Sequence, residues 1–302
     1  MKTIFRLARF QFLTASVGLY LFGVLWAILM GASMNWIRFL WGYLIIFLGH
    51  LSVSFSNDYF DIEVDCFGKP AFFSGGSGVL ISHPELRHLA RWIAIGLIGC
   101  SITLAVGYQV VFSPPGWFLG YVLLCNFLGW FYAAPPLRLS YRGLGELTTA
   151  FTAGMLVPGL GYLIMNGNLY TNALVFTAPL LFFGFGFILA VEIPDIEADL
   201  HGHKRTWVSR IGRERGYIAV AAMFLVATGL FFVFPWLYLG ELPVDPHILG
   251  LFSLLPFGGG VIGAIRKPND QPSSARLVVG IIAMLAACFI LIDSYFIFLV
   301  FH

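Results

Sequence analysis

The amino-acid sequence predicts an all-α, polytopic membrane protein, and three observations support this fold class. Of the 302 residues, 59% are hydrophobic and only 11% are charged, whereas charged residues make up about a quarter of a typical soluble domain. The mean hydropathy is +0.87. Apolar runs of about 20 residues, the length that crosses the hydrocarbon core as a helix, recur along the chain. We therefore expect one membrane domain, residues 1–302, with no separate soluble part.

Nine apolar runs are long enough to be transmembrane helices. They lie at residues 10–33, 36–56, 89–112, 116–134, 145–166, 170–191, 217–240, 247–265 and 276–301. The first run is too long for the 7–15-residue core of a signal peptide, so we interpret it as a membrane helix. The eighth run is interrupted by Pro256 and by several glycines. The sequence thus predicts nine transmembrane helices.

The basic residues indicate how these helices are oriented. Of the 17 lysines and arginines, all except Arg38 fall in the N-terminal tail and in alternate loops. By the positive-inside rule, this tail and these loops face the cytoplasm, so we expect a multi-pass protein of the cell membrane. The net charge of +2 follows from this topology, and no nucleic-acid partner is predicted. The four cysteines form no close pair, so neither a disulfide framework nor a zinc site is predicted.

Acidic residues are concentrated where the second apolar run ends. Asp58, Asp61 and Asp65 have the spacing i, i+3, i+7, which places them on one face if the helix continues through them. Carboxylates this close repel each other, and the repulsion is tolerated mainly where a cation lies between them. This cluster therefore predicts a site for a divalent metal.

The same spacing recurs at the end of the sixth apolar run. Glu192, Asp195 and Asp199 each stand 134 positions after their counterparts in the first cluster (195 − 61 for the central pair). Together, the segments 58–65 and 192–199 hold more than half of the chain's 15 acidic residues. By the orientation inferred above, both clusters open to the cytoplasm.

The loops beside both clusters contain groups that suit a phosphate. After the first cluster, Lys69 precedes the run Ser74-Gly75-Gly76-Ser77-Gly78, whose backbone N–H groups and hydroxyls can bind an anion. The alternative interpretation is a flexible loop without a ligand. Lys204 and Arg205 follow the second cluster and suit the oxygens of a metal-bound polyphosphate, although a neutral, salt-bridged loop has the same composition.

A further basic loop follows the fourth apolar run. Pro135 and Pro136 end the helix there, between Tyr132 on one side and Arg138 and Arg142 on the other. Arg138, on the constrained turn, is the better candidate for a forked contact with a phosphate. A role for Arg142 in the site and a role as a topology anchor remain equally open.

These motifs resemble those of a known family. Asn57-Asp58-x-x-Asp61-x-x-x-Asp65 and Asp195-x-x-x-Asp199 are similar to the two aspartate-rich motifs of the UbiA superfamily of intramembrane prenyltransferases, and the resemblance covers essentially the whole chain. Ser74–Gly78 and Tyr141-Arg142-Gly143-Leu144-Gly145-Glu146 look like the branch that prenylates 1,4-dihydroxy-2-naphthoate for menaquinone. Many members carry Tyr-x-x-x-Lys after the fourth span, whereas this chain has Pro136 four residues after Tyr132.

The resemblance implies a particular helical architecture. The fold would be two four-helix repeats, roughly residues 1–140 and 141–270, plus a ninth helix, around a central cavity. The 134-residue offset is what such a repeat leaves in the sequence. Because four apolar runs separate the two clusters, a parallel repeat presents both clusters to one cavity.

The resemblance also implies an enzyme that uses two Mg²⁺ ions to ionise an isoprenyl diphosphate. The enzyme would transfer the prenyl group to an aromatic acceptor in the membrane, and the protein itself would be in contact with membrane lipid. The implied metal ligands are Asn57, Asp58, Asp61, Asp65, Asp195 and Asp199. The implied catalytic residues are Asp61, Asp65, Asp195, Asp199 and Arg138. The implied substrate-binding residues are Asn57, Lys69, Ser74, Tyr132, Arg138, Arg142, Lys204 and Arg205. An acidic residue such as Glu63, Glu146 or Glu197 would orient or deprotonate the acceptor.

The sequence leaves other functions open. Within the family, 4-hydroxybenzoate or a glycerol phosphate lipid is an alternative acceptor. An ion or metabolite transporter is an alternative from another class, because intramembrane acids and internal repeats also occur in transporters. A non-catalytic membrane protein that binds a lipid or a diphosphate is a third possibility.

Overall fold

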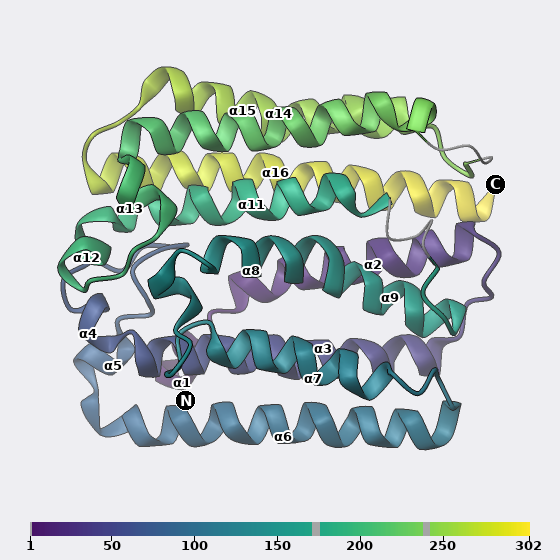
Figure 1. Ribbon diagram of the computed structural model, residues 1–302, viewed down its shortest axis with the longest axis horizontal. Coiled ribbons are helices and arrows are strands. Elements are labelled where there is room, and N and C mark those ends of the chain that lie inside the picture. Colours follow the sequence, from purple (N-terminus) through teal and green to yellow (C-terminus); the bar gives the residue numbers. More distant parts are fainter. Residues whose placement is uncertain (1, 171–175, 238–241) are drawn as a thin grey trace.

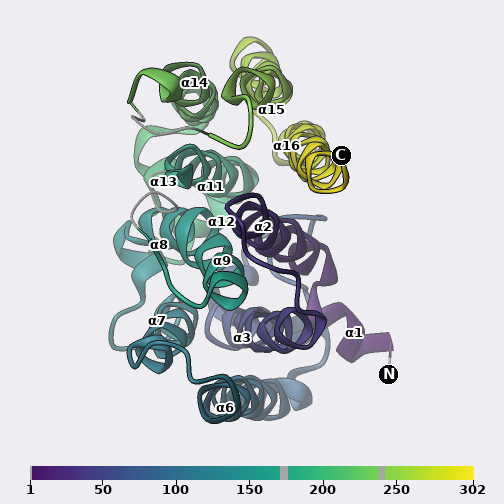
Figure 2. The same ribbon diagram turned by 90° about the vertical axis from the view of Figure 1, so that its right-hand side faces the viewer.

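The computed structural model describes residues 2–170, 176–237 and 242–302, and none of these residues belongs to a β-strand. Long helices run side by side along one axis, as Figures 1 and 2 show. Eight of the described helical segments are long and apolar enough to cross a membrane. The all-helical fold class predicted from the sequence is therefore confirmed for the described residues.

The helices of the bundle lie before and after the loop that follows α7 (Phe118–Phe131). The first part consists of α1 (Lys2–Ala8), α2 (Phe10–Leu29), α3 (Trp36–Phe60), α6 (Arg87–Phe112) and α7. The second part consists of α8 (Gly145–Phe151), a π-helical turn (Thr152–Leu156), α9 (Val157–Asn166), α11 (Ala178–Glu192), α14 (Arg213–Leu237), α15 (Pro246–Arg266) and α16 (Gln271–Phe301). The loops contain the short helices α4 (Ile62–Asp65), α5 (Val79–Ser82), α12 (Ile196–His201) and α13 (Trp207–Ile211).

The described helices differ from the nine predicted spans in one respect. The fourth predicted span, 116–134, forms α7, which has only 14 residues and is shorter than the eight helices that reach membrane-spanning length. The eighth predicted span is one continuous helix through Pro256, which membrane bundles tolerate because neighbouring groups satisfy the freed carbonyl. Residues 171–175 of the sixth predicted span and 238–240 of the seventh lie outside the described residues.

Helices α2 and α9 pack at very short range because glycines face the contact. A Cβ atom on Gly23 would lie 1.8 Å from the carbonyl oxygen of Pro158, and one on Gly161 would lie 2.2 Å from that of Tyr20. Small residues of this kind allow backbones in membranes to approach closely. The contact joins the first part of the bundle to the second.

The short helices of the loops gather at one end of the bundle. Figure 1 shows α4, α5, α12 and α13 together at the left end of the bundle. Both acidic clusters lie in this region, because α4 follows α3 and α12 follows α11. The fold therefore brings the two clusters to the same end of the molecule.

The first acidic cluster does not lie on one uninterrupted helix. Helix α3 ends at Phe60, and Asp61 breaks the helical conformation with φ −91° and ψ 4° before α4 begins. The N–H groups of Asp61 and Asp65 still donate to the carbonyls of Asn57 and Asp61, each at 2.8 Å. Because this i to i−4 pattern persists across the break, the aspartates stay on one side of the chain.

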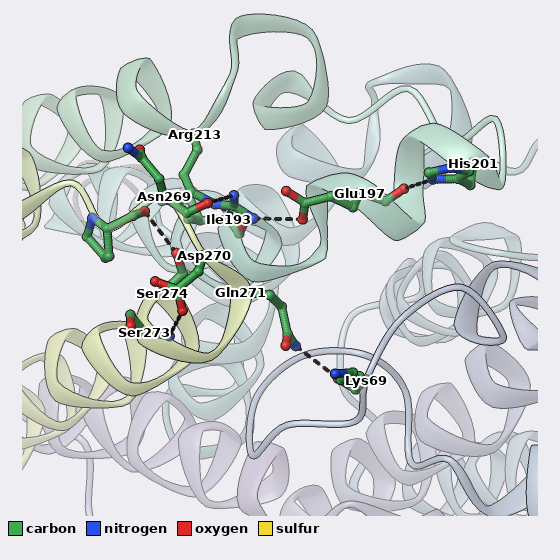
Figure 3. A network of polar contacts seen from close by, with 11 residues as sticks. Lys69, Ile193, Glu197, His201, Arg213, Asn269, Asp270, Gln271, Ser273 and Ser274 are labelled. Carbon is green, nitrogen blue, oxygen red and sulfur yellow. Dashed lines mark hydrogen bonds and ion pairs between the residues drawn. The ribbon is translucent and has the colours of Figure 1, made fainter.

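A network of polar contacts fixes the second cluster to neighbouring helix ends (Figure 3). Arg213 donates to Glu197 at 2.7 Å, to the carbonyl of Asn269 at 2.6 Å and to that of Ile193 at 3.4 Å. The side chain of Gln271 donates to the carbonyl of Lys69 at 3.1 Å. These contacts tie the loops of both clusters to the starts of α14 and α16.

Candidate active site

A cavity of about 590 Å³ opens among the helices, with both acidic clusters in its wall. Nine of the thirteen site residues predicted from the sequence line it: Asn57, Asp58, Asp61, Asp65, Ser74, Tyr132, Asp195, Asp199 and Lys204. Much of the remaining wall is apolar and includes Ile45, Leu160, Phe183, Leu285 and Phe289. The cavity therefore combines an anionic, polar region with a hydrocarbon-lined region.

Lys204 connects the two acidic clusters. Its Nζ atom lies 3.1 Å from Oδ2 of Asp61 in the first cluster, and its backbone N–H donates to the carbonyl of Asp199 in the second at 2.8 Å. Burial opposes the charge on Lys204, but the nearby carboxylates of Asp61 and Asp199 outweigh it and raise the pKa of Lys204 well above its usual value. Lys204 is thus a permanently charged cation inside the site.

The glycine-rich loop also contacts both clusters. The N–H of Gly75 donates to Oδ2 of Asp195 at 2.9 Å, and the N–H and hydroxyl of Ser77 both donate to Asp58. Gly76 has φ 59°, and a Cβ there would lie 2.0 Å from Oδ2 of Asp65. The loop needs glycine at this position because a side chain would occupy the space of the Asp65 carboxylate.

Asp65 has an unfavourable environment for its negative charge. Burial, and next the charges of Asp61 and Asp58, raise the pKa of Asp65 to about 8. The metal-free site therefore retains a proton at neutral pH. Because like charges disfavour ionisation, a bound cation would offset the repulsion from Asp61 and Asp58 and favour the ionised carboxylate.

The donor set of the cavity fits a hard divalent cation. Besides the carboxylates, Oδ1 of Asn57 and Oγ of Ser74 are buried without a hydrogen-bond partner among the described residues. Oxygen ligands of this kind suit Mg²⁺. Within residues 2–170, 176–237 and 242–302, no three acidic, histidine or cysteine side chains converge closely enough to hold a metal by themselves. Since Mg²⁺ is commonly bound by one or two carboxylates together with substrate phosphates, the site fits a metal that binds with a phosphate ligand.

The other four predicted site residues do not line the cavity. Lys69 and Arg205 are exposed, and Arg142 donates to a carbonyl of its own loop at 2.8 Å. Arg138 lies 5.0 Å from the centre of the Tyr141 ring. These cations therefore form a rim around the polar end rather than part of the cavity wall.

Tyr141 is a residue of the site that the sequence did not single out as a ligand. Its hydroxyl donates to Oδ1 of Asp61 at 2.9 Å, and its ring lies between Arg138 and Lys204, which is 5.7 Å from the ring centre. Burial and the Asp61 charge raise the pKa of Tyr141, so the phenol remains a hydrogen-bond donor. In the sequence, Tyr141 was indicated by its position in the basic loop after the fourth apolar run and by the motif Tyr141–Glu146.

Arg9 also belongs to the site, although the sequence indicated only a topology anchor. It lies between α1 and α2 with φ 45° and lines the cavity. Its guanidinium stacks 4.6 Å from the centre of the Phe12 ring and is near enough to interact electrostatically with both Asp58 and Asp195. The break between the two helices directs this cation to the acidic clusters.

The three glutamates that were expected to orient or deprotonate the acceptor do not line the cavity. Glu63 and Glu197 are exposed, and Glu146 is fully buried and accepts the N–H of Trp207. None of these three lines the cavity, whereas Glu192 does. Among the described residues, the glutamate that lines the cavity is therefore one that the sequence grouped only by its spacing.

Two curated relatives are similar to this chain. The 1,4-dihydroxy-2-naphthoate octaprenyltransferase of Bacillus subtilis is 23% identical over 206 residues, 66% of this chain and 65% of that protein. The 2-carboxy-1,4-naphthoquinone phytyltransferase of Synechocystis is 28% identical over 155 residues, 48% of this chain and 46% of that protein. The matches thus span less than two thirds of the length of either relative.

A solved structure shares the fold. The UbiA homolog from Archaeoglobus fulgidus bound to GPP and Mg²⁺ superposes with a TM-score of 0.63 at 15% identity, covering 94% of this chain and 99% of that chain. A family model described as the UbiA prenyltransferase family matches residues 18–285. Because this match spans most of the sequence, including both acidic clusters, the glycine-rich loop and Lys204, the chain belongs to the UbiA prenyltransferase family.

Proposed function

We propose that this chain transfers a prenyl group from an isoprenyl diphosphate to an aromatic acceptor in the membrane, and that the acceptor is 1,4-dihydroxy-2-naphthoate, in menaquinone biosynthesis. The observation that carries the proposal is the meeting of both acidic clusters, Lys204 and the glycine-rich loop in one cavity, much of whose remaining wall is apolar. The relatives named as naphthoate and naphthoquinone prenyltransferases support this acceptor.

The polar end would hold the diphosphate together with two Mg²⁺ ions. When bound, these ions supply charge neutralisation that helps the diphosphate to leave. The residues that would hold them are Asn57, Asp58, Asp61, Asp65, Asp195 and Asp199. The solved homologue with GPP and Mg²⁺ supports this cofactor.

The basic side chains would hold the oxygens of the leaving diphosphate, where negative charge develops. Lys204 and Arg9 are placed for this role because both line the cavity beside the carboxylates. Ser74 and Tyr132 would add hydroxyl groups to the same wall. Lys69, Arg138, Arg142 and Arg205 would attract the diphosphate from the rim.

The apolar part of the cavity would hold the isoprenoid tail and exclude water from the allylic cation. Phe183, Phe187 and Phe289 line this part. An aromatic face stabilises a nearby cation by roughly 0.5–2 kcal/mol, so these rings suit a cationic intermediate as well as a hydrocarbon. The acceptor ring would lie between this region and the diphosphate.

The proposed orientation follows from the distribution of the basic loops. We assign the protein to the cell membrane, with the N-terminus and the loops of the site in the cytoplasm and with membrane lipid around the bundle. Counting α7 with its apolar flanks as the fourth span gives nine transmembrane helices. These would form two four-helix repeats, roughly 1–140 and 141–270, and a ninth helix.

A product assay on the purified protein tests this function. The assay would contain detergent, Mg²⁺, geranylgeranyl diphosphate and one of three acceptors: 1,4-dihydroxy-2-naphthoate, 4-hydroxybenzoate or a glycerol phosphate prenyl ether. We expect a prenylated naphthoquinol that forms only with Mg²⁺. Product with only one of the other acceptors would reject the naphthoate assignment and keep the prenyl transfer. Absence of product with every acceptor, while the labelled diphosphate still binds, would reject the enzymatic proposal.

A further inference from the structure

Glu192 is a buried acidic residue that the proposed metal and diphosphate site does not use. It is the last residue of α11 and lines the cavity just before the second acidic cluster. Only 7% of its surface is exposed, and its Oε2 atom has no hydrogen-bond partner in the part of the chain that the structure describes. Because a buried carboxylate oxygen without a donor costs free energy, this side chain suits a ligand that supplies a donor.

The charges around Glu192 limit the kind of ligand. Glu146, whose side chain is within hydrogen-bonding range, and Asp199 are close enough to repel its carboxylate, and the attractive charge that acts on it is Lys204. Lys204 is already bonded to Asp61 at 3.1 Å. An anionic group placed at Glu192 would increase the repulsion, whereas a neutral hydroxyl would donate a hydrogen bond. The environment therefore favours a hydroxyl group.

A short 3₁₀ turn lies between Glu192 and α12, the helix that contains Asp199 of the second cluster. A 3₁₀ turn, Ile193–Asp195, follows Glu192 and changes the helical repeat from 3.6 to about 3 residues per turn. Asp195 then accepts a hydrogen bond from the glycine-rich loop, at Gly75. Glu192 interacts with Tyr132 and Glu146, at the end of α7 and the start of α8, as well as with Asp199. It therefore lines the cavity where these helix ends meet the second acidic cluster.

Glu192 is also distinguished from the other glutamates. Among the described residues it is the one glutamate that lines the cavity, since Glu63 and Glu197 are exposed and Glu146 accepts the N–H of Trp207. A hydroxyl-bearing ligand inside the cavity would thus meet this carboxylate and no other glutamate.

We propose that Glu192 accepts a hydrogen bond from a hydroxyl group of the aromatic acceptor and so holds the acceptor ring next to the diphosphate end of the cavity. This proposal rests on the proposed function and identifies the side chain that recognises the second substrate. A carboxylate bonded to a phenolic hydroxyl also draws the O–H proton toward itself. The aromatic ring then gains electron density, which favours attack on an allylic carbon.

The test compares the native protein with Glu192→Gln, using full-length protein in detergent. The substrates are geranylgeranyl diphosphate and either 1,4-dihydroxy-2-naphthoate or its monomethyl ethers, which each lack one hydroxyl donor. We expect the substitution to raise KM for the acceptor by about tenfold or more. The KM for the diphosphate and the half-saturating Mg²⁺ concentration should change by less than about twofold. The native protein should discriminate against one methyl ether, and the variant should lose this discrimination.

Glu197→Gln is the matched control, because Glu197 lies five positions later in the sequence and is exposed. The amide oxygen of the new glutamine can still accept a hydrogen bond from Arg213. This variant should keep both KM values. An unchanged acceptor KM in Glu192→Gln, with methyl ether discrimination intact, would overturn the acceptor site. A large shift in the Mg²⁺ requirement would overturn it in favour of a metal ligand. If Glu192→Gln does not fold, Glu192→Asp takes its place, because it keeps the carboxylate but on a side chain that is shorter by one methylene. We expect Glu192→Asp to raise KM for the acceptor. An acceptor KM equal to that of the native protein would reject the proposal. Native protein that binds the diphosphate but prenylates no hydroxylated acceptor would instead reject the proposed function itself.

Discussion

Asp61 and Asp195 stand 134 positions apart (195 − 61) and have nearly the same backbone conformation, with φ −91° and ψ 4° at Asp61 and φ −96° and ψ 1° at Asp195. Each residue directly precedes a short helix, α4 or α12, that contains the next aspartate of its cluster. Both side chains line the same cavity. This equivalence supports the proposed parallel repeat, because the same local structure recurs at the same offset as the sequence motif.

The equivalence predicts that both aspartates are needed for turnover. Asp61→Asn and Asp195→Asn each remove one negative charge while keeping the shape of the side chain, so each should weaken Mg²⁺ and diphosphate binding. We expect prenyl transfer to fall by about 100-fold or more, the size of effect seen when a group that stabilises developing charge is removed. The measurement is the Mg²⁺-dependent product assay. Glu63→Gln is the control, because Glu63 is adjacent but exposed and should keep activity; native turnover in both aspartate variants would contradict the metal site.

Lys204 is predicted to stabilise the metal-free fold as well as to hold the diphosphate. Lys204→Met would leave Asp61 and Asp199 without their buried cation, and breaking a buried ion pair from one side costs about 3–5 kcal/mol. We expect a lower melting temperature and a higher KM for the diphosphate. Mg²⁺ should recover part of the stability because it replaces the lost positive charge.

The control for Lys204 is Lys267→Met, which removes the largely exposed contact with Glu214 at 2.6 Å. Exposed pairs contribute about 0–1 kcal/mol, so the melting temperature should hardly move. Equal, small shifts for the two lysine variants would show that Lys204 does not stabilise the clusters.

Much of the fold and of the acidic wall of the cavity could be predicted from the sequence. Membrane helices depend on local composition, so their positions follow from runs of apolar residues. The spacing of Asp58, Asp61 and Asp65 and its recurrence in the second cluster identified the acidic wall of the cavity. These features are local in the sequence or repeat at a fixed offset, which is why a single sequence reveals them.

Other features depend on tertiary contacts or on local breaks that the pattern does not show. The apolar run of α7 continues into Tyr132–Ala134, but these residues turn toward Pro135, so the helix is shorter than the run. Arg9 enters the cavity because the chain breaks between α1 and α2. Tyr141 reaches Asp61 across 80 positions, and no spacing rule predicts that contact.

Glu192 shows the limit of the spacing argument. Its position relative to Asp195 and Asp199 matches that of Asp58 in the first cluster, so the pattern alone groups it with the acids that are proposed to bind metal. The 3₁₀ turn that contains Pro194 follows it, and its neighbours include Tyr132 and Glu146 as well as Asp199. A repeat in sequence therefore predicted the location of this carboxylate but not its surroundings.

Gly76 is predicted to be intolerant of any side chain. Gly76→Ala would place a methyl group where Oδ2 of Asp65 now lies, at 2.0 Å, and would strain a backbone with φ 59°. We expect the loop to move away from the clusters and product formation to fall at least about tenfold. Gly99→Ala is the control, because nothing lies within 4 Å of its Cβ position and alanine favours the helix by up to about 1 kcal/mol. Full activity in Gly76→Ala would show that the loop contacts do not matter for the reaction.

The binding of Mg²⁺ should strengthen as pH rises, because of Asp65. Its pKa is raised from 3.8 to about 8, first by burial and then by Asp61 and Asp58. The stability that the bound proton contributes is fully present below pH 3.8 and is lost as pH rises through about 8. A metal ion needs the ionised carboxylate and displaces this proton, so its stabilising effect should increase over the same window.

The measurement for this prediction is the melting temperature in detergent, with and without Mg²⁺, from pH 6 to pH 8.5. We expect the increase caused by Mg²⁺ to be small at pH 6 and to grow toward pH 8.5. Asp65→Asn should flatten this dependence, since the amide has no proton to lose, whereas Glu63→Gln should leave it as in the native protein because Glu63 is exposed. An Mg²⁺ effect that is equally large at every pH would mean that Asp65 is already ionised in the metal-free protein, and the site would then bind its metal without releasing a proton.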